Sequence, residues 1–150
     1  MKYSDQEVKL LAHALCAAYV LVAWSDGHAS APEGSVFETA RARLVSDLRL
    51  VENRMEEAAM AGLLDMYFSE DTIEAYRTLS ESDLLRRIDR ARMMVASKGS
   101  RAVAERYASK MNAIARELAE ASRSLVFVGP KVSGSERTML DRIAEVLAGP

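Results

Sequence analysis

One sequence motif, an apolar helix followed by a turn and a second helix, occurs twice in this chain, once near each end. The first copy is an apolar run that ends at Trp24, followed by a short turn and by Ser30-x-x-Glu33. The second copy has the same spacing of serine and glutamate, at Ser133-x-x-Glu136. A serine three residues before a glutamate caps a helix start, because each side chain satisfies a backbone N–H of the other residue. A unit used at both ends of a small chain predicts a pseudo-symmetric helical domain.

A single offset relates the two copies. Ser30 and Ser133 differ by 103 positions, and so do Glu33 and Glu136. The same offset pairs apolar residues with apolar residues: Leu11, Leu15 and Ala18 with Ile114, Leu118 and Ala121, and Val36, Phe37, Ala40 and Leu44 with Met139, Leu140, Ile143 and Leu147. The alternative is that two amphipathic helix pairs share this pattern by chance, since capping boxes are common. We favour a real repeat with halves at about 5–47 and 101–148.

The rest of the chain also has helical spacing, and alternating strand patterns are almost absent. The expected helices run over Asp5 to Trp24, Ala31 to Asp47, Leu50 to Phe68, the segment from the Ser69 cap to Leu79, the segment from the Ser80 cap to the break at residues 97–100, Arg101 to Phe127, and Gly134 to Leu147. No linker divides them. The sequence therefore predicts an all-α, single-domain bundle of about seven helices over residues 1–150.

Two of these helices carry more specific expectations. The first has apolar residues on every face, which predicts the central and most buried helix. In the helix expected from Leu50, the stripe predicted to face inward comprises Val51, Met55, Ala58, Ala59 and Leu63. Most other methionines, including Met66 and Met93, are expected to fill the core or its boundary rather than to line an adaptable binding groove.

The apolar first helix also raises the question of a membrane or a secretory signal. The first seven residues contain two acids and lack the basic region of a signal peptide. Ser4 and Glu7 form a capping box, as at the start of a folded helix. The apolar stretch is interrupted by His13 and is short for a bilayer span. We therefore expect a cytoplasmic protein without direct membrane insertion.

Charge and composition exclude several classes of function. The net charge of −2 gives no bulk attraction to nucleic acid. One cysteine and two histidines nearly exclude a zinc site built mainly from those residues. His13 and Cys16 share a helix face, which suits a soft metal or a thiolate–imidazole pair, but in a buried helix a core thiol beside a satisfied histidine is favoured. Asp83 and Asp89 lie around the arginines at 86, 87, 90 and 92, which favours a salt-bridged, solvated face over a docking patch for an acidic partner.

The two copies of this sequence motif resemble the TerB-like family, which is named for tellurite-resistance proteins. The hallmark is an apolar helix, an Asp-Gly turn and an acidic residue that opens the next helix; here it spans Ala23 to Glu33 with Asp26-Gly27 at the turn. The segment Leu140 to Leu147 is similar to the family's closing helix. The resemblance implies an all-helical bundle, a cytoplasmic role in metal-oxyanion or general stress, and no catalytic activity. It also implies an acidic, metal-binding surface and protein partners, some of them membrane-associated.

The second copy departs from the family pattern. It has Gly129-Pro130 where the resemblance calls for Asp-Gly, so one carboxylate is missing. If the acidic turns of the family hold a cation together, this chain has lost half of that arrangement.

A metal site remains one interpretation of the first turn. Hard cations such as Ca²⁺ or Mg²⁺ bind several oxygen ligands, and Asp26 and Glu33 could supply two, with His28 as a weak third. In the alternative interpretation, Asp26 binds turn amides and Glu33 completes the Ser30 cap.

The functional expectation is a non-enzymatic, stress-associated protein-interaction module of the TerB-like kind. A divalent-metal-binding or metal-sensing protein is the alternative. An enzyme is disfavoured, because no Gly-x-Ser-x-Gly elbow and no pairing of a nucleophile with a base can be assembled from these residues.

Overall fold

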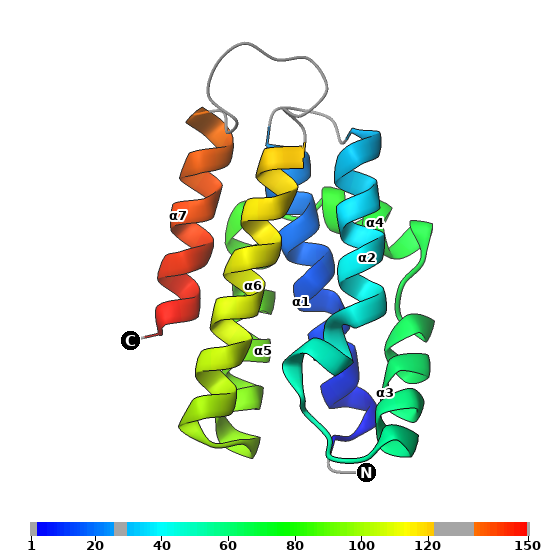
Figure 1. Ribbon diagram of the computed structural model, residues 1–150. Helices are drawn as coiled ribbons and strands as arrows, with labels where there is room; N and C mark the ends of the chain where they lie inside the picture. The colour runs from blue at the N-terminus through cyan, green and yellow to red at the C-terminus, as the bar shows by residue number, and fades with distance from the viewer. Residues whose placement is uncertain (1–2, 26–29, 122–133, 150) are drawn as a thin grey trace.

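The computed structural model describes residues 3–25, 30–121 and 134–149, and within them it contains seven α-helices and no strand. Figure 1 shows them as an elongated bundle. The helices are α1 (Asp5–Ala23), α2 (Ala31–Leu48), α3 (Arg54–Met66), α4 (Glu70–Arg77), α5 (Glu81–Lys98), α6 (Arg101–Ala121) and α7 (Gly134–Ala148). The prediction of an all-α bundle of about seven helices is confirmed.

Polar caps predicted from the sequence start most of these helices. Ser4 and Ser30 each form a complete capping box with the glutamate three residues later. The Ser69 and Ser80 side chains accept hydrogen bonds from backbone N–H groups in the first turns of α4 and α5. Each cap satisfies a donor that has no partner inside its helix, so the helix boundaries follow from local sequence.

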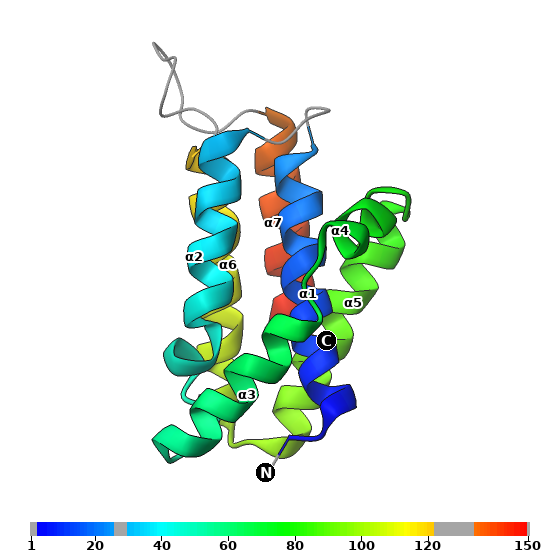
Figure 2. The same ribbon diagram turned by 90° about the vertical axis from the view of Figure 1, so that its right-hand side faces the viewer.

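Helix α1 runs through the middle of the bundle, as the two views in Figures 1 and 2 show. It packs most extensively against α5, and it also contacts α2, α3, α4, α6 and α7. By length and composition α1 could cross a membrane, but 72% of its apolar window is buried inside the fold. Burial against its neighbours accounts for the apolar character of α1, as expected for a central core helix.

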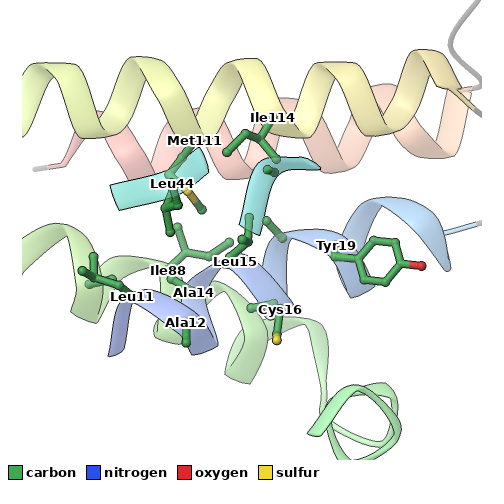
Figure 3. Packing of buried hydrophobic residues seen from close by; sticks show 14 of the residues in the cluster. Leu11, Ala12, Ala14, Leu15, Cys16, Tyr19, Leu44, Ile88, Met111 and Ile114 are labelled. Atoms are coloured by element: carbon green, nitrogen blue, oxygen red, sulfur yellow. The ribbon is translucent and has the colours of Figure 1, made fainter. Parts of the chain in front are cut away.

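The core forms where α2, α5 and α6 meet around α1. Figure 3 shows the fully buried side chains of Leu11 and Leu15 from α1, Leu44 from α2, Ile88 from α5, and Met111 and Ile114 from α6. Aromatic rings extend this core toward α3: Phe37 stacks on Tyr19 with ring centroids 4.3 Å apart and meets Phe68 edge-on at 5.6 Å. The bundle therefore has one continuous core.

The two helix pairs of the predicted repeat, α1–α2 and α6–α7, are both present. Positions related by the offset of 103 are often buried alike, for example Leu15 with Leu118 and Leu44 with Leu147. The match is imperfect, since Phe37 is buried while Leu140 is only half-buried. In Figure 1, α1 and α6 run toward the same end of the bundle, where α2 and α7 begin.

Helix α3 differs from the prediction in extent and in orientation. It begins at Arg54 rather than Leu50, because Asn53 caps it. Met60 and Leu64 face the core, whereas Met55 is 83% exposed and Ala58 and Ala59 are also exposed. The predicted inward stripe was therefore wrong at these three positions. Apolar residues occur on both faces of α3, and the helix buries the bulkier pair because it removes more apolar surface from water.

The expectation that the methionines fill the core was also wrong in part. Met60, Met94 and Met111 are buried, but Met66 is 78% and Met93 is 55% exposed. The final six residues of the helix predicted to end at Phe127 lie outside the described part of the chain.

Candidate functional site

The candidate site lies at the end of the bundle where α1 and α6 finish and α2 and α7 start (Figure 1). Three residues carried the sequence-based metal prediction. Two of them, Asp26 and His28, lie outside the described residues. The same is true of Gly129-Pro130, which replaces the Asp-Gly of the family pattern. The third, Glu33, is described. The proposed ligand set is therefore not brought together in the described residues, and its metal role stays a prediction.

Glu33 sits in the first turn of α2 and completes the predicted cap. The Ser30 backbone N–H donates to Glu33 Oε1 at 2.9 Å, and the Glu33 backbone N–H donates to Ser30 Oγ at 3.3 Å. The glutamate is only 2% exposed. The pKa of the nearby Tyr19 phenol is raised above its usual value, first by burial and second by the negative charges of Glu33 and Glu38. The capping interpretation of Glu33 is thus confirmed.

Glu136 repeats this environment in the second helix pair. It occupies the first turn of α7 and is 1% exposed. Glu33 and Glu136 are the two buried charged residues of the described chain, and the offset of 103 relates them. The sequence identified Glu136 as the counterpart of Glu33 but gave it no role in a site. The repeat offset was the signal that could have predicted its burial.

His13 and Cys16 behave as core residues. Cys16 is fully buried, and this burial raises the pKa of its thiol to about 12. Burial, and then Lys9 and Arg87, lower the pKa of His13, whose ring packs edge-on against Tyr76 at 5.3 Å. A thiol with so high a pKa does not supply a thiolate near neutral pH. The core interpretation of this pair is therefore favoured over a reactive one.

A groove adjoins the same end of the bundle. It has a volume of about 530 Å³ and is formed by α1, α4, α5 and α7. We call it the α7 groove; its lining includes Val20, Trp24, Arg77, Leu84, Met139 and Arg142. Sequence reasoning missed this site, because its residues come from four helices that are far apart in the chain.

The polar rim of the α7 groove is organised by two arginines. The Arg77 guanidinium lies over the Trp24 ring, 5.0 Å from its centroid, and pairs with Glu74 at 3.0 Å. Arg142 of α7 pairs with Glu81 at the start of α5. Glu81 also lines the groove, as do Leu21, Ser25, Ser135 and Thr138. The Ser25 and Thr138 hydroxyls donate to the backbone carbonyls of Val22 and Gly134. The groove thus combines an apolar floor with two guanidinium groups that can pair with carboxylates.

The other arginine cluster, on α5, is paired with carboxylates at two of its four positions. Arg86 contacts Asp83 at 3.1 Å and Arg92 contacts Asp89 at 2.7 Å. Arg87 donates to the Tyr76 hydroxyl at 3.0 Å. The fourth arginine, Arg90, is exposed. The two ion pairs fit the predicted solvated, salt-bridged face in part.

Comparison with known proteins adds no relative. No protein-family model, no curated protein and no solved structure matches this chain. Within the described residues, no group of three or more histidine, cysteine, aspartate or glutamate side chains is placed to hold a metal ion.

Proposed function

We propose that this chain is a non-enzymatic protein-interaction module of the TerB-like, stress-associated kind, and that the α7 groove receives a segment of its partner. The observation that carries the proposal is the composition of the groove. Val20, Leu84 and Met139 provide an apolar floor beside Trp24, and Arg77 and Arg142 bring positive charge to the rim.

This composition suits a polypeptide segment with an apolar anchor and neighbouring carboxylates. Aromatic and arginine side chains supply much of the binding energy in protein interfaces. The arginines already pair with Glu74 and Glu81 on the surface, where such pairs contribute little, so exchange for a partner carboxylate carries a small penalty.

A selection of short displayed peptides on the purified chain tests the proposal. We expect selected peptides to contain an apolar residue and acidic neighbours, and to change the fluorescence of Trp24, which is the single tryptophan. Arg142→Ala should weaken their binding about tenfold or more, roughly 1.4 kcal/mol. Arg86→Ala is the matched control, because Arg86 is also an exposed arginine in an ion pair but lies outside the groove.

Two outcomes of the peptide experiment would count against the groove. One is a selection that yields no binding peptide. The other is a set of peptides that bind the Arg142 and Arg86 variants equally well, which would place the binding surface elsewhere.

The alternative function, binding of Ca²⁺ or Mg²⁺, draws support from the two buried glutamates. Glu33 and Glu136 place two buried carboxylates in the first turns of α2 and α7, which begin at the same end of the bundle. Buried carboxylates are uncommon in proteins, and Glu33 already accepts a hydrogen bond from the Ser30 backbone N–H. Asp26, Glu33 and His28 remain the ligands proposed for this cation.

Thermal unfolding with Ca²⁺, Mg²⁺, Mn²⁺ or Zn²⁺ tests the cation proposal. A cation at about ten times its dissociation constant should stabilise the fold by about 1.4 kcal/mol, or roughly 3–6 °C in midpoint. Asp26→Ala should abolish the shift, whereas Asp71→Ala, an exposed first-turn acid on α4, should leave it intact. A midpoint that no cation moves would refute the cation site.

A further inference from the structure

The outer face of α3 is apolar, exposed and without a partner inside the described chain. Met55, Ala58, Ala59, Gly62 and Met66 recur at helical spacings and share one side of the helix. The two methionines are 83% and 78% exposed, and the three small residues between them are exposed as well. We call these five residues the α3 face. Helix α3 lies at the right-hand edge of the bundle in Figure 1 and faces the viewer in Figure 2.

No contact within the described residues of a single copy explains the glycine at position 62 of this face. A glycine inside a helix costs about 1 kcal/mol relative to alanine. A Cβ added at Gly62 would meet no atom within 4 Å, so intramolecular packing does not require the glycine. A glycine on an exposed helix face is useful where another backbone approaches closely.

The α3 face is self-complementary in shape. Its large side chains, Met55 and Met66, are at the two ends, and its small residues lie between them. When two such helices cross antiparallel, Met55 of each copy lies opposite Met66 of the other. The small residues then allow the two helix axes to come close together.

The charges at the ends of the face match the same arrangement. Arg54 stands at the N-terminal end of α3 and Asp65 near its C-terminal end. An antiparallel crossing brings Arg54 of each copy beside Asp65 of the other. Asp65 already pairs with Arg41 at 2.9 Å, yet its side chain is 60% exposed and has room for a second cation.

From these observations we propose that the α3 face binds a second copy of this chain, as an antiparallel, two-fold symmetric pair of α3 helices. Such an isologous contact uses the same patch on both copies. Helix α3 has 13 residues and is therefore about 20 Å long. A contact this small belongs to the weak end of specific interfaces, so the dissociation constant should lie in the range of about 1–100 µM.

Sedimentation of the full chain from about 1 µM to 1 mM tests this dimer, a range that brackets the expected dissociation constant. The wild type should pass from monomer to dimer. Gly62→Leu should weaken association about tenfold or more, because the added side chain separates the helices. The same change should leave the midpoint of thermal unfolding of the dilute monomer unchanged or raise it, since leucine favours helix more than glycine does.

Two further comparisons make the result specific to this geometry. Ala96→Leu adds a leucine to an exposed position of α5 and should not change association. Arg54→Glu and Asp65→Lys should each weaken the dimer, and their combination should restore it. A chain that stays monomeric throughout, or a dimer that Gly62→Leu does not weaken, would overturn the proposal. Neither outcome would affect the expected result of the peptide experiment, because the α3 face shares no residue with the α7 groove.

Discussion

Replacing Met111 with alanine is expected to lower the free energy of unfolding by about 3 kcal/mol. Met111 of α6 is fully buried and lies in the layer that contains Leu44 and Ile114, as Figure 3 shows. Truncation removes apolar contacts and leaves a cavity that the surrounding helices fill only partly. Urea denaturation followed by circular dichroism measures the loss, which corresponds to roughly 6–12 °C in the midpoint of thermal unfolding.

Met93→Ala is the matched control for this experiment. It is the same chemical change at a side chain that is 55% exposed on α5. We expect it to change the free energy of unfolding by about 0.5 kcal/mol or less. Equal losses for the two variants would mean that the packing around α6 is not as described.

Enlarging Ala14 to leucine is expected to destabilise the fold by about 3 kcal/mol, at the upper end for an overpacked core. Ala14 is fully buried in α1, which has neighbouring helices on all sides. A helix at the edge of a bundle can move outward to accommodate a larger side chain. For α1, movement away from one neighbour is movement into another, so the strain has no release.

The measurement for Ala14→Leu is again the free energy of unfolding, with Ala96→Leu as its control. Ala96 is exposed on α5, so leucine there adds no core volume and should change stability by about 0.5 kcal/mol or less. If the two leucines had equal effects, α1 would not be tightly enclosed.

Much of the fold could be predicted because helix starts depend on local chemistry. The boxes at Ser4 and Ser30 and the caps at Ser69 and Ser80 are short-range signals, and each begins a helix in the structure. The central position of α1 followed from apolar residues on every face. These signals need no knowledge of distant residues.

The orientation of α3 could not be predicted in the same way. Its sequence offers one apolar stripe through Met55 and Ala58 and another through Met60 and Leu64. Periodicity alone does not choose between them. The choice depends on the shape of the surface that α1 and α2 present, which is a property of the assembled bundle.

The candidate site was predictable only where it is local. The role of Glu33 in a cap followed from its spacing to Ser30, and the offset of 103 pointed to Glu136. The α7 groove could not be predicted, since Trp24, Arg77 and Arg142 meet only after four helices have packed. Its lining residues carry no shared sequence signal.

The central position of α1 also has a consequence for biosynthesis. Helix α1 leaves the ribosome before the helices that cover most of it, α5 and α6, which begin at Glu81 and Arg101. During translation the apolar surface of α1 therefore stays exposed until helices encoded in the second half of the chain have been synthesised. Such a nascent chain exposes a hydrophobic helix to chaperones and to aggregation until α5 has emerged, so burial of α1 during synthesis depends on pairing with helices encoded much later in the chain.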